Sequence, residues 1–205
     1  MNKNEMNAYY KKIIEQESTL SRQVGWRDEL AQKRRFEQLY KLVENHHSID
    51  IADLGCGLAG FYTFLKNHRD DFRYTGYDLS EDMIVGAKDI IMQGRESKLL
   101  LIEKTEDIKV HDFIILSGIF NMKRSIDDDS WLEYILKQLQ IIHTKSKKGF
   151  AFNLLTSYSD EAFKRDELYY ASPSLFFDYC KKHFSKNIAL LHDYDEYDFT
   201  IIVRK

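Results

Sequence analysis

Cysteine, proline and long apolar runs are scarce in this sequence, and each scarcity argues against a class of protein. Only two cysteines, Cys56 and Cys180, occur among 205 residues, and they form no C-x-x-C pair. We therefore expect no disulfide framework, and a location in the reducing cytoplasm. Pro173 is the only proline, and no linker rich in Pro, Gly or Ser divides the chain. No run approaches the roughly 18–20 apolar residues of a membrane span, and residues 1–12 lack the apolar stretch of a signal peptide.

A large excess of positive charge is missing as well. The chain has 30 Lys and Arg against 33 Asp and Glu, a formal net charge of −3. This balance argues against a broad basic surface, so we expect no nucleic-acid partner. The local run Lys145, Lys147 and Lys148 follows an expected helix, where lysines offset the negative end of the helix dipole. Apolar residues make up 43% of the chain, enough for the core of one α/β domain of this length.

Apolar periodicity indicates alternating strands and helices from residue 49 onward. Ser80 is a suitable N-cap for a helix, and the acidic run Asp127 to Asp129 precedes another helix, which we expect to end near Gly149. The last two strands are joined by a polar turn with no room for a helix, so they should form a hairpin. The expected strands are 49–54, 72–77, 99–102, 113–116, 150–155, 188–191 and 199–203.

These elements predict a Rossmann-like α/β fold. Its sheet has seven strands, mostly parallel with an antiparallel last strand, and helices cover both faces. Upstream, apolar residues at helical spacing indicate one helix around 9–14 and another around 36–43. We assign residues 1–48 to an N-terminal helical cap and residues 49–205 to the α/β domain, with the two packed as a single compact unit.

A glycine-rich segment, Asp53 to Gly60, joins the first expected strand to a helix with the sequence DLGCGLAG. A turn of this kind lets a ligand lie against bare backbone, where the helix N-terminus offers free N–H groups. Asp78 ends the next strand, eighteen residues beyond Gly60. A carboxylate at that position can accept both hydroxyls of a ribose. The sequence therefore predicts a ligand that contains a nucleoside.

Gly55, Gly57 and Gly60 also satisfy the dinucleotide pattern G-x-G-x-x-G, so an NAD-dependent oxidoreductase is one alternative. Three features oppose it. Asp53 would lie beside a pyrophosphate and repel it, the hairpin takes the place of a second βαβαβ half, and no separate catalytic domain follows. S-adenosylmethionine carries an ammonium and a sulfonium in place of phosphates, and this removes the first objection.

The whole arrangement resembles the class I S-adenosylmethionine-dependent methyltransferases. Asp53 to Gly60 matches the family's first motif, Asp78 its ribose-binding acid, and Thr105-Glu106-Asp107 its adenine region. The terminal hairpin matches the family's sixth and seventh strands, and the resemblance extends over residues 49–205. Two positions depart from the family pattern: Ala59 stands where glycine is common, and Lys104 where an acid often accepts from the adenine amino group.

The resemblance implies S-adenosylmethionine as cofactor, with S-adenosylhomocysteine as its product. Asp53 would anchor the cofactor ammonium, directly or through water, and Asp78 would hold the ribose. Gly55 and Gly57 would pack against the methionine part, with Cys56 between them as a small packing residue rather than a nucleophile. The other expected cofactor contacts are Leu79, Thr105, Glu106, Asp107 and Ser117.

Methyl transfer from a sulfonium mainly requires alignment of the acceptor and exclusion of water, so no catalytic residue is assigned. The Asp/Asn-Pro-Pro-Tyr/Phe motif that usually accompanies nucleobase and glutamine acceptors is absent after the fourth strand. We expect transfer to an O or N atom of a small polar metabolite or glycan precursor. The expected acceptor contacts are Asn121, Tyr158 and Asp160, together with Trp26, Tyr169 and Tyr170 in an aromatic pocket; the alternative for the aromatic residues is packing onto the domain.

Two other interpretations stay open: a tRNA or rRNA methyltransferase, and a non-catalytic module that keeps the cofactor pocket. No metal site is expected, since His46-His47 lies at a helix end where it would offset the dipole. We expect no membrane association, and either a monomer or a homodimer.

Overall fold

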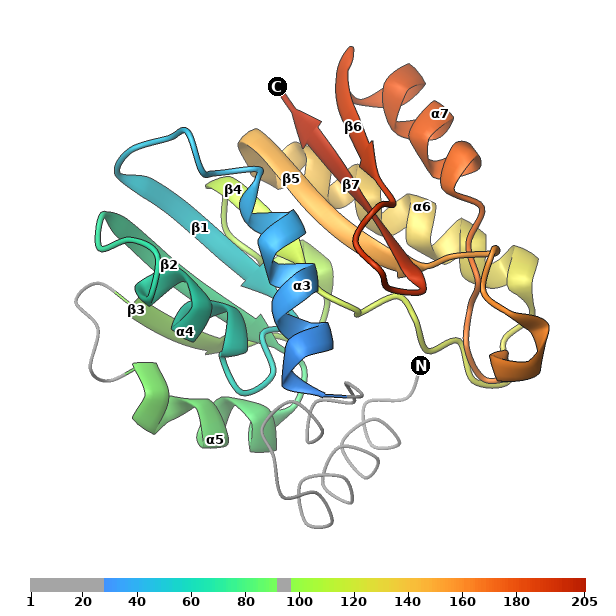
Figure 1. Ribbon diagram of the computed structural model, residues 1–205. Coiled ribbons are helices and arrows are strands. Elements are labelled where there is room, and N and C mark those ends of the chain that lie inside the picture. The colour runs from blue at the N-terminus through green and yellow to red at the C-terminus, as the bar shows by residue number, and fades with distance from the viewer. Residues whose placement is uncertain (1–27, 92–96) are drawn as a thin grey trace.

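The computed structural model describes residues 28–91 and 97–205 (Figure 1). The helix expected around 9–14 and the candidate residue Trp26 lie outside the described residues. The helix expected around 36–43 is present as α3, Glu29–Tyr40.

One seven-stranded sheet forms the centre of the molecule, in the order β3-β2-β1-β4-β5-β7-β6. The first five strands run parallel to one another, and β7 is antiparallel to both β5 and β6. The predicted mostly parallel sheet with its terminal hairpin is thereby confirmed. The strands are β1 Ile49–Leu54, β2 Phe72–Asp78, β3 Ser97–Leu101, β4 His111–Leu116, β5 Ser146–Leu155, β6 Asn187–Leu191 and β7 Asp198–Arg204.

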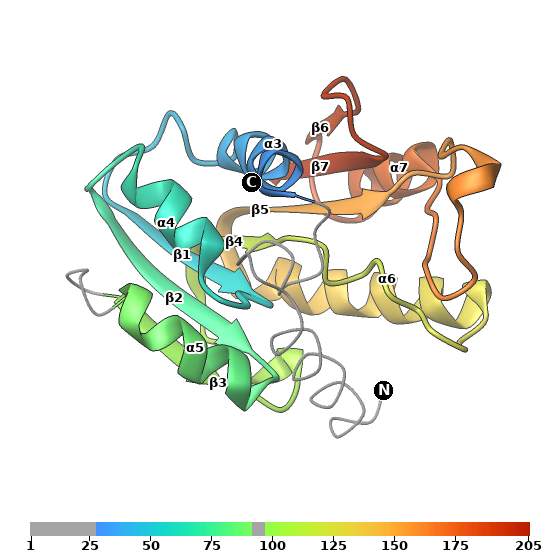
Figure 2. The same ribbon diagram turned by 60° about the horizontal axis from the view of Figure 1, so that its bottom comes forward.

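Helices cover both faces of this sheet, as predicted. Apolar side chains of α3, α4 and α5 share one core cluster with one face of the sheet, and those of α6 and α7 share another with the opposite face. Figures 1 and 2 show α3 and α4 on one side of the strands and α6 on the other. The helices besides α3 are α4 Gly60–Lys66, α5 Glu81–Ile91, α6 Asp128–Lys145 and α7 Pro173–His183, with short 3-10 turns at Thr105–Asp107 and Glu161–Phe163.

Local sequence explains where several helices begin. Asp127 caps α6 by accepting from the Ser130 N–H at 2.9 Å, and Ser172 with Pro173 at the first turn begins α7. The Ser80 side chain faces the backbone N–H of Met83 at the start of α5. α3 packs with α4 in the same core cluster. The division of the chain into a helical cap, residues 1–48, and an α/β domain, residues 49–205, stays a prediction.

Five of the seven strands start earlier than predicted, and the largest shift is four residues, at β5. β3 begins at Ser97 rather than Leu99, and β5 begins at Ser146, so α6 ends at Lys145 and not near Gly149. Gly149 pairs with Phe113 and Arg204 inside the sheet, where an added Cβ would meet the Val203 carbonyl oxygen at 2.3 Å. This glycine therefore permits close strand approach and does not end a helix.

The prediction that the lysine run offsets a helix dipole fits only Lys145, which lies in the last turn of α6. Lys147 and Lys148 lie in β5 and pair with Asp112, at 3.7 and 2.8 Å. The longer β5 thus changes the partner of two of the three lysines.

Candidate functional site

The glycine turn between β1 and α4 is held in a conformation that ordinary residues rarely adopt. Gly55 has φ +75° and Gly57 has φ +52°, and Ala59 is also left-handed at +58°. The N–H groups of Gly55 and Cys56 donate to the Tyr77 carbonyl at 2.7 and 3.0 Å, which ties the turn to the end of β2. A Cβ at Gly55 would lie 2.3 Å from a methyl carbon of Ile119. Glycine is therefore required there both by φ and by the loop that crosses above it.

Asp78 connects this turn to α5 through its carboxylate. Oδ2 accepts from the Gly57 N–H and Oδ1 from the Ser80 N–H, both at 2.9 Å. Burial raises the pKa of Asp78, and the backbone hydrogen bonds from Ser80, Gly57 and Leu79 oppose that rise. Each carboxylate oxygen retains a further lone pair, so Asp78 can still accept from ligand hydroxyls.

Asp53 is the most deeply buried acid of the site, at 2% exposed. The Tyr74 hydroxyl donates to its Oδ2 at 2.7 Å. Burial raises the pKa of Asp53 to about 7; the Tyr74 hydrogen bond opposes this rise and the nearby charge of Asp78 adds to it. Within residues 28–91 and 97–205, no Lys, Arg or His forms an ion pair with Asp53 or Asp78. A buried carboxylate without a cation is costly, and a positively charged ligand would relieve that cost.

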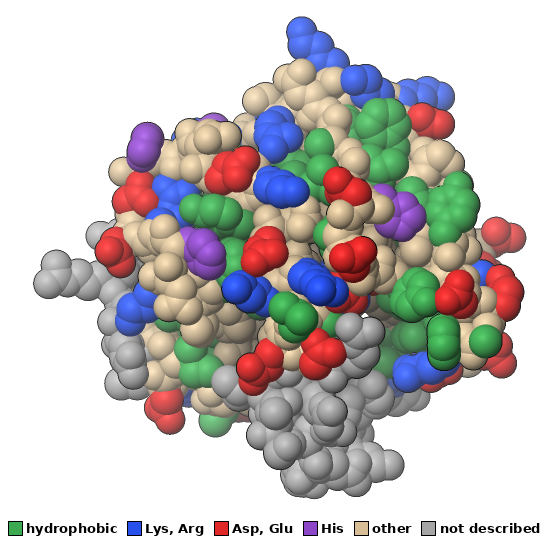
Figure 3. All heavy atoms as spheres, in the orientation of Figure 1, with side chains coloured by type: hydrophobic (Ala, Val, Ile, Leu, Met, Phe, Trp, Pro, Cys, Tyr) green, Lys and Arg blue, Asp and Glu red, His purple; other side chains and the backbone are tan. Residues whose placement is uncertain are grey.

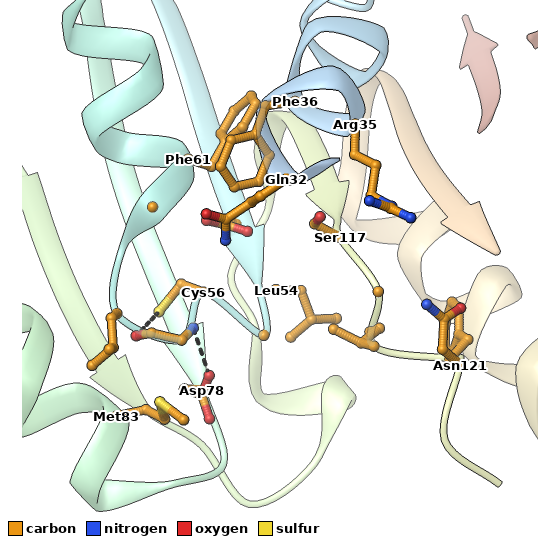
Figure 4. Close-up of a pocket in the computed structure, with 18 of the residues that line it drawn as sticks. Gln32, Arg35, Phe36, Leu54, Cys56, Phe61, Asp78, Met83, Ser117 and Asn121 are labelled. Carbon is orange, nitrogen blue, oxygen red and sulfur yellow. Dashed lines mark hydrogen bonds between the residues drawn. The ribbon is translucent and has the colours of Figure 1, made fainter. Parts of the chain in front are cut away.

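These groups line a cavity of about 860 Å³ at the carboxyl ends of the parallel strands. Its position beside β1 and β4, where the strand order reverses, is where open α/β sheets bind their ligands. Figure 4 shows Cys56 and Asp78 on one side of the cavity, Gln32 and Phe36 above, and Ser117 and Asn121 on the other side. The predicted site residues that the structure brings to the cavity are Asp53, Gly55, Cys56, Gly57, Asp78, Leu79, Thr105, Ser117 and Asn121.

Two predicted adenine contacts lie outside this lining. Glu106 and Asp107 are exposed on the short turn after β3. The Asp107 carboxylate accepts from the backbone N–H groups of Glu103 and Lys104, at 3.3 and 3.2 Å. This local capping role accounts for Asp107, so contact of either acid with adenine stays a prediction.

Four predicted acceptor contacts also lie away from the cavity. Tyr158 is 74% exposed, and Asp160 accepts a hydrogen bond from the Tyr197 hydroxyl. Tyr169 packs in the core that contains α6, and the Tyr170 hydroxyl accepts from the Arg165 N–H at 3.0 Å. The structure does not bring these four side chains into the cavity with Asn121. The segment after β5 contributes Arg165 and Leu168 to the lining instead, and only the backbone N–H of Tyr169 reaches the Asn121 carbonyl, at 2.8 Å.

Several lining residues were missed by sequence reasoning. Gln32, Arg35 and Phe36 come from α3, and Trp131 and Tyr134 come from α6. The helical spacing of Phe36 marked a buried face of α3, but nothing in the sequence indicated that one end of that face opens into a cavity. Tyr74, the hydrogen-bond donor to Asp53, was likewise missed, since its strand position indicates only a core side chain.

Comparison with known proteins decides the family. No family model matches the chain. The Mycobacterium tuberculosis protein named "Putative methyltransferase Rv1506c" is 39% identical over 165 residues, which cover 80% of this chain and 98% of that protein. Identity at this level over nearly the whole relative, on the sheet and glycine turn described above, places the chain in one family with it. The chain belongs to the class I S-adenosylmethionine-dependent methyltransferases.

Solved structures share the fold of the methyltransferase. Magnesium protoporphyrin IX methyltransferase (ChlM) from Synechocystis PCC 6803, with bound SAH, has a TM-score of 0.72 at 11% identity, with complete coverage of both chains. The N-methyltransferase NodS from Bradyrhizobium japonicum WM9, in complex with S-adenosylhomocysteine, has a TM-score of 0.67 at 11% identity and 97% coverage of each chain. At such low sequence identity, these similarities show a shared fold and nothing more.

Three further properties of the methyltransferase bear on its partners. On the face seen in Figure 3, basic and acidic side chains are intermingled. Among the residues described, no helix combines the length and apolar character needed to cross a membrane. Nor does the described part of the chain gather three or more His, Cys, Asp or Glu side chains in a metal-binding arrangement.

Proposed function

We propose that the methyltransferase binds S-adenosylmethionine across the glycine turn, with the amino acid tail toward Asp53 and the ribose hydroxyls on Asp78. The observation that carries this proposal is the buried Asp53 carboxylate, which has Tyr74 as a donor but no cation among the described residues. The cofactor ammonium would supply the missing positive charge. A dinucleotide would instead bring a diphosphate toward the same carboxylate, where repulsion is strong at low dielectric.

Further contacts follow from the cavity lining. The bare backbone of Gly55 and Gly57 leaves room for the cofactor tail, and Leu79 and Thr105 lie on the side where the adenine would extend from the ribose. The Ser117 Oγ is buried in the lining and has no hydrogen-bond partner among the described residues. A hydroxyl in this state can donate to the cofactor carboxylate or accept from its ammonium.

For the acceptor, we propose an O or N atom of a small polar metabolite or glycan precursor. A cavity of about 860 Å³ must hold the cofactor and the acceptor together, which favours a small molecule over a folded RNA. Asn121 lies in this lining, and its Oδ1 accepts from the Leu155 N–H at 3.2 Å, which orients the amide at the end of β5. The amide Nδ2 is then available to donate to an oxygen of the acceptor.

Calorimetry with purified protein tests the cofactor assignment. We expect S-adenosylhomocysteine to bind with saturable heat and NADH to give none. Asp78→Ala should weaken S-adenosylhomocysteine binding by about tenfold or more, because hydrogen bonds to a charged acceptor are lost. Asp82→Ala is the matched control: it removes the same charge from the exposed side of α5 and should leave the affinity unchanged.

The outcomes separate the alternatives. Binding of NADH without binding of S-adenosylhomocysteine would favour the oxidoreductase and refute the proposal. Incubation of the enzyme with S-adenosylmethionine and a cell-extract metabolite pool should release S-adenosylhomocysteine and add one methylene mass to a small molecule. Cofactor binding without any such product would favour the non-catalytic module, and a product found only with bulk RNA would favour the RNA methyltransferase.

A further inference from the structure

A buried ionic cluster joins α3 to the terminal hairpin on the face of the sheet that α3 covers. Arg35, whose side chain is 7% exposed, donates through Nε to Asp198 Oδ2, pairs through a terminal nitrogen with Glu196 at 3.2 Å, and donates to the Ala31 carbonyl at 2.8 Å. Arg34 pairs with the other Glu196 oxygen at 3.3 Å. Two arginines of α3 therefore face two buried carboxylates around β7; Arg35 is buried with them, whereas Arg34 is 34% exposed.

This cluster continues to the loop after β4 through one side chain. Asn153 in β5, which is fully buried, donates through Nδ2 to Asp198 Oδ2 at 3.3 Å. Its Oδ1 accepts from the Gly118 N–H at 2.9 Å. Asp198 Oδ2 thus receives both Arg35 and Asn153, while Asp198 Oδ1 is buried without a partner among the described residues. Asp198 Oδ2 is therefore the atom that links Arg35 to Asn153.

The loop at the end of this chain of hydrogen bonds forms one wall of the cavity. Ser117, Gly118 and Ile119 all line it, and Gly118 is left-handed at φ +73°. Ile119 packs directly over Gly55 of the glycine turn. The position of the Gly118 amide therefore sets how closely this wall approaches the place where the cofactor tail would lie.

We propose that Arg35, Asp198 and Asn153 form a positioning relay, through which α3 holds the loop after β4 in the geometry that receives the cofactor. The relay is separate from the direct contacts of Asp53 and Asp78, since neither Asn153 nor Asp198 lines the cavity. Its effect on cofactor affinity rests on the proposed function, whereas its effect on the Gly118 amide does not. Arg35 itself lines the cavity beside Ser117 (Figure 4), so α3 contributes a side chain directly to the site.

The relay is tested at two points with the full chain. Asn153→Ala removes the acceptor for the Gly118 N–H and the donor to Asp198. Arg35→Lys keeps the charge but replaces the planar guanidinium, whose three nitrogens each reach a different partner, with a single ammonium nitrogen. We expect hydrogen exchange of the Gly118 amide, followed by NMR, to accelerate about tenfold or more in Asn153→Ala and measurably in Arg35→Lys. We expect the affinity for S-adenosylhomocysteine, measured by calorimetry, to fall about tenfold in Asn153→Ala.

A control variant separates positioning from general stability. Asp50→Asn weakens the 3.0 Å contact between Asp50 and His111, which lies at the starts of β1 and β4, at the opposite end of these strands from the cavity. It should lower the unfolding temperature while leaving S-adenosylhomocysteine affinity and Gly118 exchange unchanged. If Asn153→Ala lowers only the unfolding temperature, as the control does, the relay is refuted.

If Asn153→Ala does not fold, the exchange rate of the Gly118 amide in Arg35→Lys is the deciding measurement. A rate unchanged from wild type in Arg35→Lys overturns the proposal. If the wild-type protein binds no S-adenosylhomocysteine, the proposed function fails, and amide exchange still tests the relay on its own.

Discussion

At the scale of single residues, the two buried acids of the site have different surroundings. Asp78 accepts two backbone N–H groups, which stabilise its charged form even though burial opposes it. Asp53 has one hydroxyl donor, Tyr74, and its pKa is raised to about 7 by burial. Near neutral pH, Asp53 is therefore balanced between its neutral and charged forms, and a bound cation would shift that balance toward the carboxylate.

This balance predicts that cofactor binding depends on pH through Asp53. The affinity for S-adenosylhomocysteine should rise between pH 5.5 and 7.5, by up to roughly tenfold per pH unit below about 7, because the ammonium binds the ionised carboxyl. Asp53→Asn should bind weakly at every pH in that range and remove the dependence. Calorimetry across the range measures both effects.

Tyr74→Phe provides a second check on the same residue. Loss of the hydroxyl removes the hydrogen bond that holds the Asp53 pKa down, so the rise in affinity should move to higher pH. An unchanged profile in Tyr74→Phe would mean that another group controls the titration.

At the scale of elements, the sequence predicted most of the chain. β1 begins and ends at the predicted residues, Ser80 lies at the predicted start of α5, and the terminal hairpin is present. Prediction failed at the junction of α6 and β5, where Gly149 looked like a helix end. Local propensity cannot distinguish a glycine that ends a helix from one that admits a neighbouring strand, because the two differ only in a contact with β7.

The strand assignment of Gly149 makes a prediction about stability. Gly149→Ala should lower the free energy of unfolding by about 1–3 kcal/mol or more, because the new Cβ meets the rigid Val203 carbonyl at 2.3 Å. Gly86→Ala is the comparison: its Cβ meets only the end of the Leu58 side chain, and alanine favours the α5 helix. Urea denaturation should show a clear loss for Gly149→Ala and little change for Gly86→Ala; equal effects would contradict the assignment.

At the scale of the whole molecule, the buried acids make the stability of the ligand-free protein depend on pH. The pKa of Asp53 is raised in the folded state, so its stabilising contribution is complete below the unfolded value, about 4, and is lost as the pH rises through about 7. The pKa values of Asp78 and Asp198 are raised in the same direction. Burial lowers the pKa of His143, which acts in the opposite sense below pH 6.5.

We therefore compare wild type with Asp53→Asn to isolate the one carboxyl. Without ligand, the free energy of unfolding of the wild type should fall relative to Asp53→Asn between pH 5.5 and 7, by at most about 1.4 kcal/mol per pH unit. S-adenosylhomocysteine at 100 times its dissociation constant should restore about 2.7 kcal/mol to the wild type. Urea unfolding at several pH values measures both quantities; parallel curves for the two proteins would contradict the titration of Asp53.

The sequence by itself determined the order of strands and helices along the chain, the glycine turn, and the acids near the carboxyl ends of β1 and β2, Asp53 and Asp78, because these depend on local spacing and backbone preference. The tertiary structure alone decided that Tyr74 supports Asp53, that α3 contributes Arg35 to the cavity, and that Tyr158 and Asp160 lie outside it. Those facts depend on how elements distant in the chain pack side by side. Burial, and with it the pKa of Asp53, arises only when α3, the glycine turn and the loop after β4 close around one space.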